Sequence, residues 1–358
     1  MRLQATSLIH FGTMTLLRQW QTLYLPSPAR PVSHNHISRG LTEAPFERKE
    51  QNMRSIDTIN EKSNTIEAWL RDRGMALRVD GGRVMPRTVQ LRLAGSPFGP
   101  SLRDHLNASA EEIAVALGVP RIAVYSDSRT RALYVEFPRP DAKFLDLWPL
   151  YRKVQEQYPI PPLTALLGLD TDDGAPTLLR LNNWLAHHVL IAGAVGIGKT
   201  ALARTIALSL AASNSPESLR LKAVGDVLYT LPHLDHLVQD WPTALVAVAR
   251  GAHLAAILDD WNGEDHRWLR MLESGNDRVH LIAVTSNVDM VSQWREVFPT
   301  HILGCGAEPA GYAPLLAAGD FYIRSPRGTT RLTAAWVDPG GSVPQTTDAA
   351  PALLERGQ

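Results

Sequence analysis

The stretch GAVGIGKT, Gly193 to Thr200, decides how the rest of the chain is interpreted. It fits the pattern G-x-x-x-x-G-K-[ST] at every fixed position. The apolar run 188–192 (HVLIA) precedes it and predicts a short buried strand, whereas the run 201–210 (ALARTIALSL) has the apolar spacing of a helix. A strand, a glycine-rich loop and a helix in this order are the context in which such a loop binds phosphate groups. The stretch therefore predicts the nucleotide-binding loop of an α/β protein.

Each fixed residue of this loop has a physical task. Gly193 and Gly198 can adopt backbone angles that are closed to other residues, so the loop amides can turn toward phosphate oxygens. The N-terminus of the following helix supplies further donors. Lys199 would place a positive charge on the β- and γ-phosphates, and the Thr200 hydroxyl would bind Mg²⁺. The alternative is an ordinary strand-to-helix turn with an incidental Lys-Thr pair, and the two flanking elements argue against it.

A second apolar run, residues 253–258 (HLAAIL), ends in Asp259 and Asp260. An acidic residue at the tip of a buried strand is the second part of many phosphate-loop sites, where its carboxylate holds Mg²⁺ directly or through water. Asp260 would then polarise the attacking water as a general base. The alternative is a strand that ends in a polar turn, with the two acids as caps.

The apolar run 279–285 predicts another buried strand, with Thr285 at its carboxyl end. Ligands of open α/β sheets bind at that edge, so Thr285 would contact the γ-phosphate, unless it only caps the strand end. The predicted catalytic residues are Lys199, Asp259 and Asp260, and the predicted metal ligands are Thr200 and Asp259. The residues expected to bind the nucleotide are Gly193, Ala194, Val195, Gly196, Ile197, Gly198, Lys199, Thr200, Ala201 and Thr285.

Composition limits the class of protein. The 358 residues suffice for about two domains, and the 36 basic residues balance the 36 acidic ones, which excludes a strongly basic body for non-specific nucleic-acid binding. Cys305 is the only cysteine, so the sequence has no disulfide, and a reducing cytoplasm is the expected location. No apolar run reaches the ~18 residues of a membrane span, and no signal peptide is expected.

Prolines, glycines and charge runs divide the chain into five expected parts. Residues 1–55 are expected to be a disordered extension, in which Met53 is an alternative start of translation. A small α+β domain follows, with a helix from residue 56 and a second helix capped by Ser109. The expected boundaries are 56–140 for that domain, 141–162 for a linker, 163–338 for the phosphate-loop domain and 339–358 for a disordered tail.

With both motifs placed, residues 56–338 resemble the motor region of the FtsK/SpoIIIE DNA translocases. Several segments share the order that they have in that family: PLTALLGLD (162–170), HVLIAG (188–193), VHLI (279–282), FPTHI (298–302) and LLAAGDF (315–321). The resemblance implies a RecA-like phosphate-loop domain with a central, mostly parallel sheet, preceded by a small α domain. It further implies ATP and Mg²⁺ as ligands, double-stranded DNA as partner, and assembly into a hexameric ring.

The chain departs from that family at positions that matter for turnover. The family has Glu after the magnesium-organising acid, where this chain has the shorter Asp260, and it has Thr-Gln-Arg-Pro where this chain has residues 285–288 (TSNV). Three hypotheses follow. The first is an ATP-driven DNA motor, the second is a nucleotide-gated regulatory subunit with little hydrolysis, and the third, which lacks a visible acceptor site, is an unrelated phosphate-loop enzyme such as a kinase.

Overall fold

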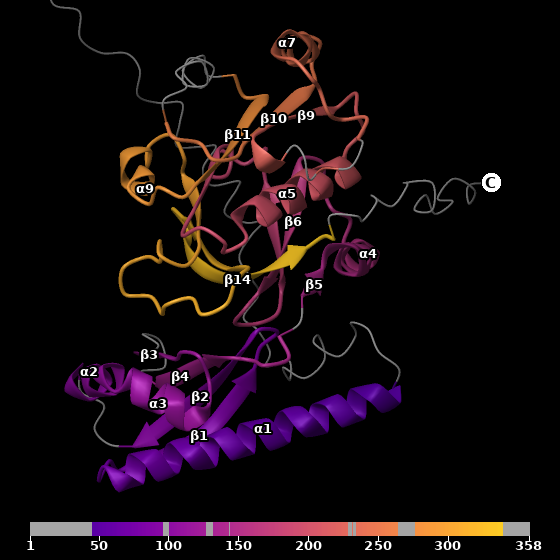
Figure 1. The fold of residues 1–358 in the computed structure, drawn as a ribbon. Helices are drawn as coiled ribbons and strands as arrows, with labels where there is room; N and C mark the ends of the chain where they lie inside the picture. Colours follow the sequence, from indigo (N-terminus) through magenta and orange to yellow (C-terminus); the bar gives the residue numbers. More distant parts are fainter. Residues whose placement is uncertain are drawn as a thin grey trace, which may run out of the picture. The chain divides into compact units, whose positions relative to one another are not determined.

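The computed structural model describes residues 45–95, 100–126, 132–142, 144–227, 231, 234–263 and 276–338, and Figure 1 shows their arrangement. Two sheets carry the fold. We call the four-stranded sheet near the N-terminus the small sheet and the ten-stranded sheet the large sheet. Residues 1–44 of the expected extension and residues 339–358 of the expected tail lie outside the described residues.

The small sheet is antiparallel, in the order β1-β2-β4-β3, and three helices pack on its apolar face. Ile66 and Leu70 of α1 and Ile113 of α3 share a buried core with Leu91 and Phe137 of the sheet. The elements are α1 (Pro45–Asp72), β1 (Leu77–Val84), β2 (Thr88–Gly95), α2 (Pro100–Ala108), α3 (Ala110–Leu117), β3 (Ala123–Ser126) and β4 (Leu133–Pro138). This is the α+β composition that the alternating and helical patterns predicted.

Two local expectations need correction. The first helix begins at Pro45, eleven residues before the predicted start at residue 56, and a proline at a helix start costs no hydrogen bond. Ser109 does precede α3, but its side chain makes no capping hydrogen bond. The other end of α3 is as predicted, because Gly118 ends it in the left-handed conformation.

The large sheet has the order β7-β6-β14-β13-β12-β8-β11-β10-β9, and β5 pairs with β14 at its margin. The five strands from β12 to β9 are parallel, as expected around a phosphate loop, whereas the pairs from β7 to β12 are antiparallel, so the sheet is mixed. The strands are β5 (Leu145–Asp146), β6 (Thr164–Asp170), β7 (Pro176–Arg180), β8 (Val189–Ala192), β9 (Leu219–Val224), β10 (His253–Leu258), β11 (Val279–Thr285), β12 (Thr300–Leu303), β13 (Asp320–Ser325) and β14 (Gly328–Trp336).

The segment 141–162, which was expected to be a linker, contains the helix α4 (Leu147–Gln157). Asp146 caps it by accepting a hydrogen bond from the Trp148 amide, 3.1 Å away. The helix buries Leu147, Leu150, Tyr151 and Val154, which have the spacing of one helical face. The short apolar pattern lies just before a proline-rich stretch, and the prolines misled the sequence interpretation.

Both faces of the parallel strands are covered. Val189 and Ile191 of β8 face α5 (Lys199–Ser213), while Leu190 between them belongs to a second core with Met290 of α9 (Met290–Gln293) and Phe298. The remaining described helix of more than one turn, α7 (Trp241–Ala249), packs beside β9 and β10 (Figure 1). None of the helices in the described ranges combines the length and apolar character that crossing a bilayer requires.

The helix α5 is buried on nearly all sides, which is unusual because it carries polar residues. Those residues bond to the backbone around them. The Thr205 hydroxyl donates to the Ala335 carbonyl at 2.9 Å, Arg204 donates to the Asp338 carbonyl at 2.8 Å, and Ser209 accepts from the Leu166 amide at 2.7 Å. These bonds hold α5 to β6 and to the end of β14.

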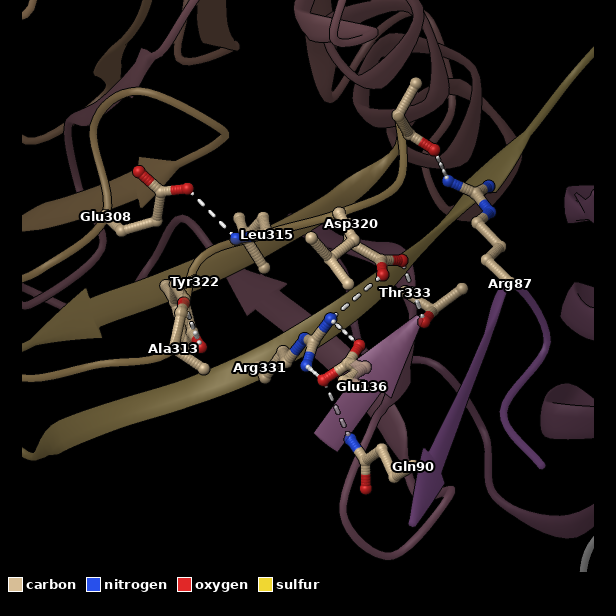
Figure 2. A network of polar contacts seen from close by, with 12 residues as sticks. Arg87, Gln90, Glu136, Glu308, Ala313, Leu315, Asp320, Tyr322, Arg331 and Thr333 are labelled. Atoms are coloured by element: carbon tan, nitrogen blue, oxygen red, sulfur yellow. Dashed lines mark hydrogen bonds and ion pairs between the residues drawn. The ribbon is translucent and has the colours of Figure 1, made fainter. Parts of the chain in front are cut away.

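A buried ionic cluster joins the two sheets (Figure 2). Arg331 of β14 donates two hydrogen bonds of 2.7 Å to the carboxylate of Glu136 on β4. It also contacts Asp320 of β13 at 3.3 Å, and Asp320 accepts from the Thr333 hydroxyl at 3.2 Å. Burial alone would lower the pKa of Arg331, but the charges of Glu136 and Asp320 raise it, so the guanidinium stays charged.

Histidines gather at the amino ends of the parallel strands, the edge opposite the phosphate loop. His280 of β11 stacks on His253 of β10, with ring nitrogens 3.0 Å apart, and His187 packs edge-on against both His188 and His280. Burial lowers the pKa of His188 to about 4 and that of His280 to about 3. Within the described residues, no group of three or more histidine, cysteine or acidic side chains could hold a metal ion, and these rings contact one another as a packed cluster.

Candidate nucleotide-binding site

The phosphate loop runs from the end of β8 to the start of α5, as the motif predicts. Gly193 has φ 151°, and a Cβ there would lie 2.6 Å from the Ile197 side chain and 3.2 Å from the Cys305 carbonyl oxygen. Gly198, at φ 96°, caps α5 in the left-handed conformation. These two positions admit only glycine without strain, so the fixed glycines of the motif are explained by the backbone itself.

Two neighbouring segments brace the loop from outside. The Ala194 amide donates to the Cys305 carbonyl at 2.7 Å, and the Gly319 amide donates to the Ile197 carbonyl at 2.9 Å. Ala194 was expected to bind the nucleotide, but its N–H is used by this internal bond. Among the described residues, no acceptor is found for the amides of residues 195–198, and the first amides of α5 have no partner within the helix.

Lys199 lies against this ring of amides. Its side chain is buried, and its ammonium donates to the Ala194 carbonyl at 2.8 Å. Burial lowers the pKa of Lys199, and the charges of Asp259 and Asp260 oppose that effect. The loop thus has several backbone donors without a partner among the described residues and one cation beside them, which is the donor set that an oligophosphate requires.

Thr200 and Asp259 meet across the site. The Thr200 hydroxyl donates to one carboxylate oxygen of Asp259 at 3.2 Å, and the Val227 amide donates to the other at 3.1 Å. The Asp259 amide in turn donates to the Val224 carbonyl at 2.9 Å, which ties the tip of β10 to the tip of β9. Burial raises the pKa of Asp259, although the hydrogen bonds from Thr200 and from nearby amides lower it in part.

This pair fits Mg²⁺. The ion takes hard oxygen ligands, keeps several waters, and is usually held by one or two carboxylates together with phosphate oxygens. A hydroxyl and a carboxylate at hydrogen-bond distance beside a phosphate loop are such a set, and a cation would relieve the burial that raises the pKa of Asp259. Neither residue has a basic side chain as an ion-pair partner in the part of the chain that the structure describes.

Asp260 has an unusual backbone. It is exposed and adopts φ 58°, in the left-handed region that few residues other than glycine and asparagine or aspartate tolerate. The next residue, Trp261, turns back so that its amide donates to the Val284 carbonyl at 2.7 Å. The charge of Asp260 acts on Lys199, so this residue lies near the phosphate loop.

Thr285 and Ala201 lie near the loop. Thr285 is buried at the end of β11 and pairs in register with Ala192, the residue before the loop. Its hydroxyl accepts a hydrogen bond from the Asn287 amide at 3.1 Å, which is the strand-end cap that the sequence left open as the alternative. Ala201 lies in the first turn of α5.

The sequence interpretation missed the residues that brace the loop. Cys305 and Gly319 belong to the segment between β12 and β13, where the sequence analysis used only the family-like stretch 315–321. Arg87, which contacts residue 318, was not singled out from the sequence, and its side chain is buried. Only Gly319 carried a local signal, since an isolated glycine before a strand often marks a close backbone approach.

Comparison with known proteins agrees with this site. A profile of the FtsK/SpoIIIE family matches residues 146–260, which include the phosphate loop and Asp259. The DNA translocase SftA of Bacillus subtilis (strain 168) is 29% identical over 158 residues, which is 43% of this chain and 15% of SftA, so the chain spans a small part of that relative.

Solved structures with a similar arrangement include ATPases 2 and 3 of EccC from Thermomonospora curvata in complex with a signal sequence peptide. The match has 18% identity and a TM-score of 0.42, and it covers 56% of this chain and 45% of that one. ATPases 2 and 3 of EssC from Geobacillus thermodenitrificans match with 15% identity and a TM-score of 0.40, over 68% of this chain and 64% of that one. Residues 146–260 thus match the FtsK/SpoIIIE family, and the part of the site within them has the geometry of a phosphate-binding loop beside an acidic strand end.

Proposed function

We propose that the chain binds ATP·Mg²⁺ between the phosphate loop and the tip of β10, and that it works as an FtsK/SpoIIIE-like motor on double-stranded DNA. The observation that carries this proposal is the 3.2 Å contact between Thr200 and Asp259. It brings the two expected magnesium ligands together from positions 59 residues apart in the chain. The family match supports the motor class, and the name of SftA supports DNA as the partner.

The roles of the residues follow from the contacts. The loop amides and Lys199 would bind the phosphates, and Thr200 and Asp259 would hold Mg²⁺, which neutralises the charge on the phosphates when bound. Asp260 would orient the attacking water. We also propose that the 56–140 and 163–338 regions are separate domains, and that several copies form a ring.

A second function is favoured by one observation. Asp260 lacks a methylene relative to the glutamate of the family, and it lies in a left-handed conformation that fixes its reach. A base displaced by about 1 Å can lose on the order of 100-fold in rate. The chain would then bind ATP with little hydrolysis and act as a nucleotide-gated regulatory subunit.

Two measurements on the same preparation separate these functions. Binding of mant-ATP with Mg²⁺ by the unaltered chain, and its loss in Lys199→Ala, is expected for both. DNA-stimulated ATP hydrolysis that Asp259→Ala abolishes supports the motor, whereas binding with no turnover on any duplex supports the regulatory subunit. Mass photometry with ATP and duplex DNA reports ring assembly, and a chain that stays monomeric under these conditions contradicts the ring.

A further inference from the structure

The segment 304–319 lies between the phosphate loop and the small sheet. On one side it contacts the loop through two backbone bonds, from Ala194 to the Cys305 carbonyl and from Gly319 to the Ile197 carbonyl. Its own shape is held by Glu308, whose carboxylate accepts from the Gly306 amide at 2.9 Å and from the Leu315 amide at 3.0 Å (Figure 2). The Glu308 carboxylate therefore ties residues 306 and 315 of the segment to each other.

Arg87 reaches this segment from the small sheet. It lies in the turn between β1 and β2, and its side chain is buried (Figure 2). One nitrogen of the guanidinium donates to the Ala318 carbonyl, and the other donates to the Ala334 carbonyl on β14 at 3.1 Å. The Ala334 amide donates to the Gly319 carbonyl at 2.8 Å, so Arg87, residues 318–319 and Ala334 form a closed ring of hydrogen bonds, which we call the circuit. The planar fork of an arginine can join two backbone segments in this way, whereas a lysine cannot.

Gly319 is shaped to receive this side chain. Its φ is 84°, and a Cβ at that position would lie 1.7 Å from a guanidinium nitrogen of Arg87. The glycine thus lets the arginine close over the backbone whose amide holds the phosphate loop.

The bond from Gly319 to the loop has a direct effect on phosphate binding. A trans peptide unit directs its carbonyl and its N–H to opposite sides. Because the Ile197 carbonyl is held by the Gly319 amide, the N–H of the same peptide unit, which belongs to Gly198, is directed away from residue 319. That amide is one of the loop donors without an acceptor among the described residues, so residue 319 sets the direction of a phosphate donor.

We infer that Arg87 is a positioning residue, which couples the small sheet to the phosphate loop through Ala318, Gly319 and Ile197. The inference rests on the proposed binding of a nucleotide at that loop. The coupling must act in both directions, because linkage is reciprocal. If one arrangement of the small sheet strengthens nucleotide binding at the loop, then nucleotide binding must stabilise that arrangement of the small sheet. A partner that moves the β1–β2 turn would change the affinity for ATP without contacting it.

The first test compares two arginines of the small sheet region that donate to the same segment. Arg87→Ala is expected to weaken mant-ATP·Mg²⁺ binding about tenfold, the size that residues between coupled sites contribute. Arg121→Ala is the matched control. Arg121 donates to the Leu316 carbonyl, three residues before Gly319, and has no bond to the circuit, so its loss is expected to leave the Kd unchanged. Arg87→Lys should restore part of the affinity, because one carbonyl keeps a donor.

The second test uses the unaltered chain, so it does not depend on a variant that folds. ATP·Mg²⁺ is expected to slow hydrogen exchange at the Met85 and Arg139 amides, which donate to the Thr88 and Arg87 carbonyls of the turn. In Arg87→Ala the protection should disappear even at saturating nucleotide. If Arg87 only stabilised the fold, its loss would lower the free energy of unfolding, but nucleotide would still slow hydrogen exchange at the two turn amides.

The outcomes separate the inference from the proposed function. If the unaltered chain binds no mant-ATP, the proposed function is wrong and the inference falls with it. If the chain binds mant-ATP, but Arg87→Ala has the same Kd or the turn shows no change in exchange, the inference alone is wrong. Weaker binding in Arg87→Ala and Arg121→Ala alike would also overturn it, because the effect would then come from any loss of contact with segment 304–319.

Discussion

Two aspartates of the large sheet show how differently one sheet can bury a carboxylate. Asp320 starts β13 and is almost fully buried, with Arg331 and Thr333 as partners. Asp259 follows β10, is half-buried, and accepts hydrogen bonds from the Thr200 hydroxyl and from backbone amides. Burial raises the pKa of both carboxyls. The charges of Arg331 and Arg87 oppose this effect at Asp320, and hydrogen bonds oppose it at Asp259.

The difference separates a structural cluster from a binding site. The ionic cluster of Arg331, Glu136 and Asp320 has a cation of its own that contacts both carboxylates, the charge of Arg87 acts on Asp320 as well, and the cluster joins the two sheets. The pair of Thr200 and Asp259 has no salt bridge among the described residues, although the charges of Asp259 and Lys199 interact, so it can still accept a magnesium ion. Removing a charge should therefore cost stability at the first place and ligand affinity at the second.

The largest effect is expected from breaking the ionic cluster. Arg331→Met leaves Glu136 and Asp320 buried without their cation, and should lower the free energy of unfolding by about 3–5 kcal/mol. Denaturant unfolding measures this. Arg324→Met is the matched control, because Arg324 is exposed on the neighbouring strand and its loss should stay within about 0.5 kcal/mol. If Arg331→Met lowered the free energy of unfolding by less than about 1 kcal/mol, the ionic cluster would not stabilise the fold as this comparison predicts.

The second prediction applies the opposite expectation to Asp259. Asp259→Asn keeps the size of the side chain and removes a charge that burial disfavours, so the free energy of unfolding should hardly change. Binding of mant-ATP in the presence of Mg²⁺ should weaken on the order of 100-fold, the usual cost of one charge-stabilising group. With EDTA the two proteins should bind the nucleotide alike. Equal affinity in Mg²⁺ would show that the carboxylate does not hold the ion.

The histidine cluster tests a third arrangement, in which buried groups are kept neutral. His280 has a pKa lowered to about 3 by burial first and then by neighbouring histidines, so the unfolded chain binds its proton first as the pH falls. Stability is therefore present above about pH 6.5 and declines as the pH is lowered toward 3, with His280 contributing on the order of 1 kcal/mol of loss by pH 5.5. Arg278 and Asp277 near His253 act in opposite directions.

Unfolding measured between pH 7 and pH 5 checks this expectation. His280→Leu should show a shallower decline than the unaltered chain, while His105→Leu, at an exposed position on α2, should keep the original slope. If the His280→Leu protein loses stability as steeply as the unaltered chain, the buried ring is not what makes the fold sensitive to acid.

The smallest effect is expected at Asp260. If the rest of the site is intact, Asp260→Glu should raise steady-state ATP hydrolysis about threefold, because the longer side chain reaches further toward the water. Asp226→Glu is the control, since Asp226 is exposed and lies close enough to affect the pKa of Asp259. An unchanged or lower rate for Asp260→Glu would show that the left-handed backbone, and not the side-chain length, limits Asp260.

The parts of the molecule that the sequence predicted are those whose signals are local. The motif from Gly193 to Thr200, the apolar strand before Asp259, and the strand over residues 279–285 are each set by a few adjacent residues, and the structure has them where they were expected. The four parallel pairings of the large sheet follow from these strands and the connections between them.

The parts that were missed depend on contacts between distant residues. Nothing near Arg87 indicates that its partner lies 231 residues later, or that a charged residue there would be buried. The hydrogen bond from the Ala194 amide to the Cys305 carbonyl is equally hard to predict from the sequence, because it forms only when β12 lies next to β8. The helix α4 was missed for a different reason, since its four buried residues lie beside prolines that favour an extended reading.

The many bonds that hold α5 to the rest of the large sheet have a mechanical consequence. Thr205, Ser209 and Arg204 anchor the helix to backbone on β6 and at the end of β14, so it cannot slide or tilt without breaking several buried bonds at once. The helix α5 is therefore the fixed side of the proposed site. If the site binds a nucleotide, we expect any movement that follows to occur at the ends of β9 and β10 and in the segment before β13.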